Sequence, residues 1–317
     1  MQALVVGADG AMGLEHVPFE LREGEVSIRI VAAGICGTDL QILEGYAGFT
    51  GIPGHEFVGV VEEVSSPADA GWIGRRVVGE INVGCRQCAW CAAGVREHCR
   101  SRSVVGIRGR SGAFAERLSL PVSNLHAVPE GVEDRAAVFV EPLAAACRIL
   151  EQVVVGPSTR CAVVGDGRMG LLVAQVLRTR ARDITLFGKH ESKMAVARAL
   201  GVGTATDAVP AAGCFDLAVD VTGRPEGLGQ AVALTRPRGT VVLKSTFHGE
   251  AAIATWPIVV EEVTLVGSRC GPFGRALELL ASREVEVLSL VSKTAPLDQW
   301  RSAFAEARQR LKVLFLP

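Results

Sequence analysis

The stretch CAVVGDGRMG, residues 161–170, decides the fold of the second half of this chain. Its first four residues are an apolar run of the kind that forms a buried strand, and its last six have the pattern GxGxxG. Helical composition follows as far as residue 180, and residues 184–187 form a second apolar run. Strand, glycine turn, helix and strand in this order predict one βαβ unit.

The glycines of this motif are Gly165, Gly167 and Gly170, and Met169 precedes the last of them. Glycine permits a tight turn and lets the backbone approach a pyrophosphate, whose charge then lies at the helix N-terminus. By itself the pattern is a weak signal in a chain with 36 glycines. Between a strand and a helix it predicts a dinucleotide-binding site.

The residue that ends the second strand of such a unit bears on the choice of cofactor. An acidic residue there would accept the ribose hydroxyls of NAD. In this chain the position is Gly188, followed by Lys189 and His190, with Lys193 one turn further on. No carboxylate opposes a 2′-phosphate, and the basic residues can pair with one. The sequence therefore favours NADP(H), and NAD bound with one contact missing stays open.

The region after this unit repeats the alternation of strand and helix. Further apolar runs lie at residues 217–221, 240–243 and 263–266, and helical segments separate them at 191–200 and 227–234. Because strands alternate with helices of this length, we expect a doubly wound parallel sheet of the Rossmann type. Two more helices, over 273–282 and 297–310, and a short strand over 312–316 end the chain.

The first 150 residues have a different character. Short β-rich runs lie at residues 25–33, 56–64 and 75–78, with many glycines and few patterns of helical length. This composition predicts a mostly β domain. We assign residues 1–149 and 268–317 to that domain and residues 150–267 to the Rossmann domain.

Four cysteines in GCRQCAWCAAGVREHC, residues 84–99, have the spacing of metal ligands. They are Cys85, Cys88, Cys91 and Cys99. Four thiolates complete the tetrahedral shell of a zinc ion and leave no position for a substrate, so this cluster predicts a structural zinc site. An iron–sulfur cluster, which also takes four thiolates, is the alternative.

Three other fragments carry a second set of possible zinc ligands. The fragments GICGTD, GHE and EPLA contain Cys36, His55, Glu56 and Glu141. A catalytic zinc needs three protein ligands and one open position, which these residues could supply. Each residue alone is a weak signal, because single cysteines are usually buried apolar residues and single histidines are usually hydrogen-bonded.

Together these motifs resemble the zinc-dependent medium-chain alcohol dehydrogenase family over nearly the whole chain. The resemblance is closest to the sorbitol, threonine and polyol dehydrogenase branch. It implies a GroES-like catalytic domain beside the Rossmann domain, and one catalytic and one structural zinc. It also implies an alcohol or carbonyl substrate of small size and a homodimer or homotetramer. Cys36, His55, Glu56 and Glu141 would surround the catalytic zinc.

The same resemblance assigns the chemistry to named residues. Hydride would pass between the substrate carbon and the nicotinamide, with zinc acting on the substrate oxygen. Asp39 would orient His55, and the Thr38 hydroxyl would lie between that oxygen and the cofactor ribose. Many relatives have a histidine three residues after this threonine, where this chain has Gln41. Because glutamine does not titrate, we expect water or another group to take the proton to solvent.

Charge and hydropathy exclude other classes of partner. Lys and Arg number 33 and Asp and Glu number 34, so no general field attracts nucleic acid or an anionic membrane. No stretch approaches the ~20 uninterrupted apolar residues of a membrane span, and the N-terminus lacks the pattern of an export signal, so we expect a cytoplasmic protein. A non-catalytic NADP(H)-binding or redox-sensing protein that keeps both zinc sites is the alternative function.

Overall fold

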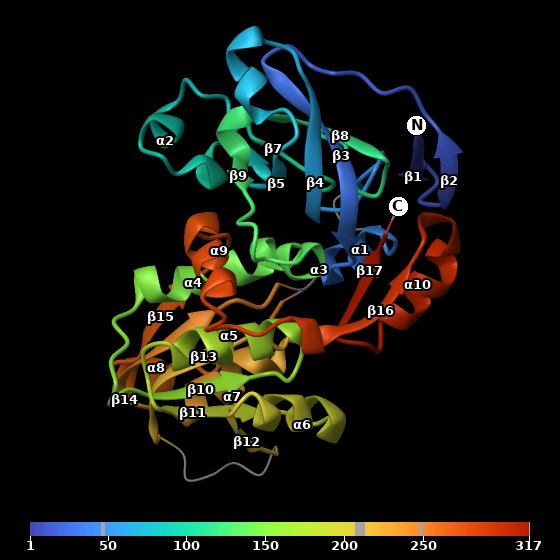
Figure 1. The fold of residues 1–317 in the computed structure, drawn as a ribbon. Helices are drawn as coiled ribbons and strands as arrows, with labels where there is room; N and C mark the ends of the chain where they lie inside the picture. Colours follow the sequence, from blue (N-terminus) through green and yellow to red (C-terminus); the bar gives the residue numbers. More distant parts are fainter. Residues whose placement is uncertain (46–47, 207–212, 247–249, 317) are drawn as a thin grey trace. The chain divides into compact units, whose positions relative to one another are not determined.

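The apolar runs of the second half form the parallel sheet that the sequence predicts. The computed structural model describes residues 1–45, 48–206, 213–246 and 250–316. Its strands here are β10 (Arg160–Val164), β11 (Asp183–Phe187), β12 (Gly203–Ala205), β13 (Phe215–Asp220), β14 (Thr235–Leu243) and β15 (Thr264–Gly267). In the described part, they pair in parallel in the order β12, β11, β10, β13, β14, β15 (Figure 1). The order reverses between β10 and β13, as in doubly wound dinucleotide-binding folds.

Helices connect these strands and cover the sheet. They are α4 (Val140–Gln152), α5 (Arg168–Arg178), α6 (Glu191–Ala199), α7 (Glu226–Leu234), α8 (Trp256–Val260) and α9 (Phe273–Ala281). Helix α5 packs on β10 and β11, and α7 packs on β13 and β14. Since crossovers between parallel strands are right-handed, the reversal in strand order places helices on both faces of the sheet. The side chains of Phe187 and Phe215 meet edge to face in its core, with ring centroids 5.7 Å apart.

A second sheet organises the first part of the chain. Its strands are β3 (Glu25–Gly34), β4 (Glu56–Val64), β5 (Arg76–Gly79), β8 (Arg117–Pro121), β9 (Leu125–Ala127), β16 (Val291–Ala295) and β17 (Lys312–Phe315). The order is β16, β17, β3, β4, β5, β9, and β8 also pairs with β3. Strand β3 is therefore the centre of this sheet, and it joins the C-terminal strand β17 to the N-terminal strands.

Smaller elements complete this part. They are the paired strands β1 (Gln2–Val6) and β2 (Met12–His16), the paired strands β6 (Asn82–Val83) and β7 (Ser103–Val104), and the helices α1 (Gly37–Ile42), α2 (Ala89–Ala92), α3 (Asp134–Ala137) and α10 (Trp300–Ala307). The ring of Phe114 is fully buried and lies 5.9 Å from Phe304 and 5.1 Å from Phe315, centroid to centroid. The apolar core of the sheet thus includes residues from both ends of the chain.

Contacts divide the chain into two units with limits that differ from the expected ones. The first unit contains residues 1–141 and 291–317, and the second contains residues 142–290. Residues 142–149 and 268–290, which the sequence assigned to the catalytic domain, thus belong by contacts to the second unit. The side chain of Gln175 explains part of this, because it donates to Glu286 O at 2.9 Å and accepts from Glu286 N at 2.8 Å.

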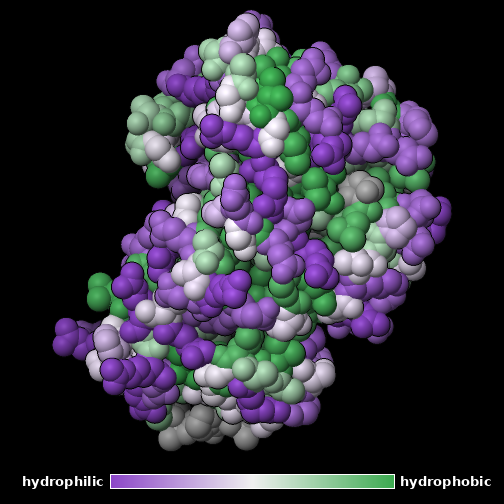
Figure 2. All heavy atoms as spheres, viewed as in Figure 1, coloured by the Kyte–Doolittle hydropathy of each residue, from purple (hydrophilic) through white to green (hydrophobic). Residues whose placement is uncertain are grey.

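The predicted fold class is confirmed, and several elements went unpredicted. The sequence patterns predicted no strand at β1, β2 or β12 and no helix at α4. The helix expected over residues 297–310 is a short 3-10 turn at Leu297–Gln299 followed by α10, which ends at Ala307. In the described part of the chain, no helix is long and apolar enough to cross a membrane. The face in Figure 2 carries hydrophilic residues interspersed with apolar ones.

Candidate metal centres and dinucleotide pocket

The four-cysteine lobe brings its thiols to one point. The Sγ atoms of Cys85, Cys88, Cys91 and Cys99 all lie within 4.8 Å of one another. Arg86 has a left-handed φ of 63°, which turns the backbone between the first two cysteines, and α2 follows directly after Cys88. Figure 1 shows α2 in a loop region at one side of the sheet. Four convergent thiols in a lobe of this kind fit one tetrahedral zinc ion.

The thiol of Cys85, the first cysteine of this lobe, has a lowered pKa. Backbone N–H groups of Gln87 and Cys88 donate to Cys85 and lower the pKa of its thiol to about 6. Because the thiolate is the form that binds metal, this environment favours ligation by Cys85, whereas burial raises the pKa of the Cys91 thiol to about 11.

A second group joins three of the four residues that the resemblance places around the catalytic zinc. Ligand atoms of Cys36, His55 and Glu56 lie within 4.8 Å of one another. Cys36 precedes α1, and Glu56 begins β4 with His55 just before it. Glu141 lies in the first turn of α4 and is not part of this group. The structure therefore assembles a set of thiol, imidazole and carboxylate, the donor types that zinc accepts.

The carboxylate of Asp39 connects the two segments that supply these ligands. It accepts hydrogen bonds from Cys36 N at 2.7 Å and from Gly54 N at 3.3 Å, and its Oδ1 lies 3.4 Å from His55 Nδ1. Burial lowers the pKa of His55, but attraction from Asp39 and Cys36 outweighs burial and raises this pKa well above its usual value. Asp39 is thus placed as expected for the residue that orients the imidazole.

Several buried atoms in this group lack hydrogen-bond partners. In the described part of the chain, five buried side-chain N or O atoms form no hydrogen bond, and three of them belong to this group. His55 Nδ1 faces Asp39 Oδ1 and Glu56 Oε2 is ion-paired with Lys312, which leaves Glu56 Oε1 as the atom of this group with no contact to a polar neighbour. Native structures rarely leave buried polar atoms unsatisfied unless a ligand or ion is bound there. The site chemistry therefore fits a zinc ion held by these side chains.

Sequence reasoning missed Lys312, which lies beside this group. Its side chain is 0% exposed, and its ammonium forms an ion pair with Glu56. Nζ also donates to Ile35 O at 3.4 Å and lies 5.5 Å from the centre of the Phe139 ring. Burial lowers the pKa of Lys312 to about 8. A lysine within the apolar run LKVLFL was the signal that could have revealed it.

Gly34 makes room for this ion pair. A Cβ atom at Gly34 would lie 2.6 Å from Lys312 Cε and 2.8 Å from Glu56 Oε2. Both contacts are too short for a side chain of any size. A side chain at this position of β3 would therefore force the side chains of Lys312, Glu56 and Val138 to shift.

The glycine motif of the second unit borders a pocket of about 440 Å³ at the carboxyl ends of β10, β11 and β13. Its lining includes six predicted cofactor residues, namely Gly165, Gly167, Gly188, Lys189, His190 and Lys193. Met169 and Gly170 lie in the first turn of α5 and do not line the pocket. A Cβ atom at Gly170 would lie 1.9 Å from Gly165 O, so this glycine permits the tight turn. The pocket lies at the switch point where such folds bind dinucleotides.

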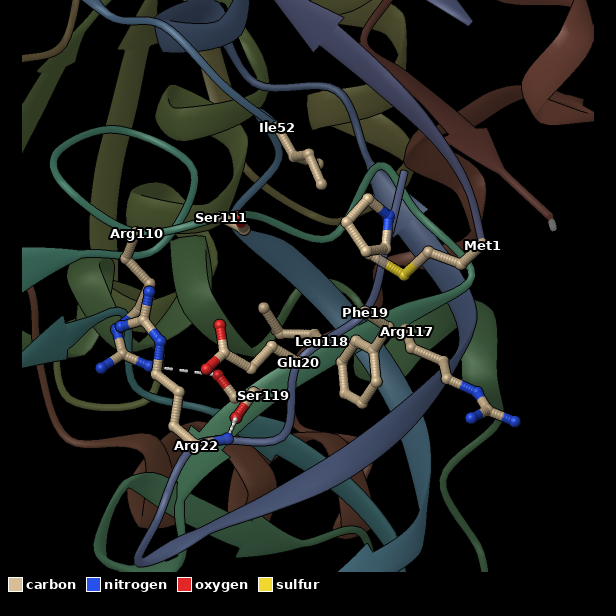
Figure 3. Close-up of a pocket in the computed structure, with 11 residues that line it drawn as sticks. Met1, Phe19, Glu20, Arg22, Ile52, Arg110, Ser111, Arg117, Leu118 and Ser119 are labelled. Carbon is tan, nitrogen blue, oxygen red and sulfur yellow. Dashed lines mark hydrogen bonds between the residues drawn. The ribbon is translucent and has the colours of Figure 1, made fainter. Parts of the chain in front are cut away.

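Another pocket, of about 180 Å³ in the first unit, contains none of the predicted site residues. Figure 3 shows Arg22 and Arg110 near Ser119 at one side of it. The guanidinium of Arg110 contacts both oxygens of Glu25 at 2.9 Å, and Arg117 lies 3.3 Å from Glu62. Because two of the three arginines that line the pocket pair with carboxylates, we do not assign a ligand to it.

Comparison with known proteins agrees with this arrangement. Residues 22–130 match the model of the alcohol dehydrogenase GroES-like domain. The chain is 31% identical to an L-threonine 3-dehydrogenase of Streptomyces avermitilis, over 97% of this chain and 96% of that protein. This chain belongs to the zinc-dependent medium-chain alcohol dehydrogenase family. It is accordingly an enzyme, an oxidoreductase that uses a nicotinamide cofactor.

Solved structures share the fold of this dehydrogenase over the full chain. A zinc-binding dehydrogenase candidate from Sinorhizobium meliloti 1021, solved with NADP, has a TM-score of 0.89 at 26% identity and covers 100% of this chain and 99% of its own. A short chain alcohol dehydrogenase (rspB) from Escherichia coli CFT073, solved with NADH, has a TM-score of 0.91 at 23% identity, with coverage of 100% and 99%.

Replacing Lys312 with methionine should make the stability of the dehydrogenase depend more strongly on zinc. Removing one partner of a buried ion pair costs about 3 kcal/mol, because the other charge is left unpaired. We expect that loss in denaturant unfolding with a chelator present, and a smaller loss with zinc present, since the metal can then pair with Glu56. Lys293→Met, which removes a partly exposed lysine paired with Glu306, is the matched control. Equal losses with and without zinc would contradict the pairing of Lys312 with Glu56.

Proposed function

We propose that this dehydrogenase transfers hydride between an alcohol and NADP(H), with two zinc ions per chain. The alcohol classes we propose are polyols, amino alcohols and secondary alcohols, and the reverse reaction reduces a carbonyl. The observation that carries the proposal is the convergence of Cys36, His55 and Glu56, with Glu56 Oε1 buried and without a hydrogen bond. The four-cysteine lobe would hold the second zinc. Glu141 stays a proposed neighbour of the catalytic zinc.

The residues around this group have distinct proposed roles. Zinc bound there would act as a Lewis acid on the substrate oxygen. Asp39 would keep the His55 ring in one orientation, and Lys312 would fix the carboxylate of Glu56. The Thr38 hydroxyl lies 3.9 Å from Cys36 Sγ, close enough to the proposed ligands to receive the substrate proton. Gln41 in the same helix α1 does not titrate, so the proton would continue through water.

The basic side chains at the end of β11 support the choice of NADP(H). Lys189, His190 and Lys193 line the pocket beside the glycine motif. Gly188, where an acid would accept the ribose hydroxyls of NAD, has no room for a side chain, because its Cβ would lie 2.5 Å from Asp166 Cβ. Cations at this position favour a 2′-phosphate, and the nearby carboxylate of Asp166 already accepts hydrogen bonds from Lys189 N and His190 N.

The exposed edge of the second unit supports a homodimer or homotetramer. Strand β15 ends the described order of its sheet, so its outer side has no strand partner there, although Gln152 donates to Gly267 O at 3.0 Å. On α8, Trp256, Val259 and Val260 are 65%, 74% and 64% exposed. An apolar surface beside an open sheet edge fits a second copy of this chain, whose own β15 would pair antiparallel across a two-fold axis.

Zinc content tests the metal sites. We expect two zinc ions per wild-type chain, one in Cys36→Ser with loss of alcohol oxidation, and one in Cys99→Ser with loss of stability. Cys214→Ser, which changes a cysteine outside both groups, is the control and should retain two. Metal analysis with turnover assays on a panel of alcohols measures this. A single zinc in the wild type that Cys36→Ser does not remove would favour the non-catalytic NADP(H)-binding or redox-sensing function.

Cofactor binding tests the nicotinamide preference. Fluorescence titration should show that NADPH binds at least ~10-fold more tightly than NADH, because charge-assisted hydrogen bonds to the 2′-phosphate contribute roughly 1.5–3 kcal/mol each. The double variant Lys189→Ala with Lys193→Ala should lose most of this difference and bind NADH as the wild type does. Tighter binding of NADH by the wild type would rule out the preference.

Molar mass in solution tests the assembly. Light scattering should give a dimer or tetramer for the wild type. Val259→Glu should shift it toward the monomer, because a charge would be buried against the second copy. Val154→Glu is the matched control, since Val154 is 96% exposed and lies outside α8 and β15. A wild-type monomer, or a Val259→Glu variant as large as the wild type, would contradict this interface.

A further inference from the structure

The turn of the glycine motif contains a buried carboxylate, that of Asp166. Asp166, the second residue of GDGRMG, is 7% exposed. Its Oδ2 accepts hydrogen bonds from Lys189 N at 2.8 Å and from His190 N at 2.7 Å. His190 Nδ1 lies 3.0 Å from both carboxylate oxygens. Because a carboxylate only accepts hydrogen bonds, Nδ1 carries the proton in this contact.

The position of the Asp166 side chain leaves no space for a Cβ atom at residue 188. A Cβ atom at Gly188 would lie 2.5 Å from Asp166 Cβ and 2.7 Å from Asp166 Oδ2. A side chain at the end of β11 is therefore incompatible with Asp166 in its present position. The carboxylate that doubly wound folds place at the strand end is here supplied by the turn after β10, and it approaches the same point from the other side.

The orientation of this carboxylate differs from that of a strand-end acid. Burial raises the pKa of Asp166, but hydrogen bonds from His190 and Lys189 outweigh burial and lower it, so the group is charged at neutral pH. Both oxygens contact the backbone or ring of residues 189 and 190. Its oxygens thus accept hydrogen bonds from the protein, and the His190 ring is the charged partner beside it.

We propose that Asp166 is a positioning residue for cofactor choice, holding Lys189 and His190 at the pocket so that they bind a 2′-phosphate. The role rests on the proposed preference for NADP(H). Two backbone N–H groups and one ring are fixed by a single carboxylate, which reduces the entropy lost when the basic side chains bind an anion. Asp166 therefore acts through Lys189 and His190 and does not contact the phosphate.

Two adenosine phosphates separate this role from a general structural one. Calorimetric titration of the zinc-loaded enzyme would use adenosine 2′,5′-bisphosphate and adenosine 5′-monophosphate, which differ only in the 2′-phosphate. Asp166→Ala should weaken binding of the bisphosphate by about tenfold, as expected for the loss of charge-assisted hydrogen bonds that order its ligands, and should change monophosphate binding by less than about twofold. In steady state the KM for NADPH should rise while kcat and the KM for NADH are unchanged.

Asp166→Asn provides a second variant of the same shape. Its amide oxygen can still accept from the backbone, but the charge that holds the His190 ring is gone, so we expect a smaller loss of bisphosphate binding than in Asp166→Ala. Asp183→Ala is the matched control, because Asp183 is an exposed carboxylate at the opposite end of β11 that pairs with Arg160. It should bind both ligands as the wild type does. Thermal unfolding of each variant verifies the fold.

These titrations separate the proposed preference for NADP(H) from the proposed role of Asp166. Equal binding of both ligands by the wild type overturns the NADP(H) preference and this role with it. A wild-type preference for the bisphosphate that persists in Asp166→Ala overturns the role of Asp166 alone. An equal loss for both ligands reduces Asp166 to a structural residue. Tighter bisphosphate binding by Asp166→Asn means that the carboxylate repels the phosphate, which also overturns the proposal.

Discussion

Charged side chains buried in a β-sheet domain require partners, and Asp39 shows how this constraint assembles the metal-binding group. Its carboxylate is 1% exposed and obtains donors from Cys36 and Gly54. The contact fixes the segment before α1 against the segment before β4, and it places His55 beside the same carboxylate. The pairing of β3 with β4 sets Gly34 opposite Glu56 and so brings Cys36 near these ligands, and Asp39 fixes the two segments where the strands end. The proposed zinc chemistry depends on that arrangement.

A second buried charge completes the group from the other end of the chain. Lys312 reaches Glu56 because β17 pairs with β3 and because Gly34 leaves space for its side chain. A buried ammonium and a buried carboxylate each cost several kcal/mol to desolvate, and their pairing offsets part of that cost. The core around them is apolar and well packed, with Phe114, Phe304 and Phe315 in ring contact.

A buried carboxylate also orders the loop beside the proposed dinucleotide pocket of the second unit. Asp166 is buried, obtains donors from the loop after β11, and approaches that loop through a glycine that has no Cβ to obstruct it. In both units a buried carboxylate accepts hydrogen bonds from a loop that carries predicted binding residues, and in the second unit Gly188 permits the close approach. Lys189 and Lys193 are then presented on a backbone that is already ordered before the cofactor binds.

The sequence by itself determined those features that depend on residues close together in the chain. Periodicity and the glycine motif predicted the parallel sheet, and the spacing of Cys85, Cys88, Cys91 and Cys99 predicted one metal group, because those ligands lie within one short lobe. Short elements such as β12 escaped prediction, since three residues carry too little periodicity. Only the tertiary structure decided which distant residues meet. Lys312 and Ile35 are 277 residues apart, and Asp166 and His190 are 24 apart. Their contacts depend on strand pairing and on space left by glycines, which no local pattern specifies.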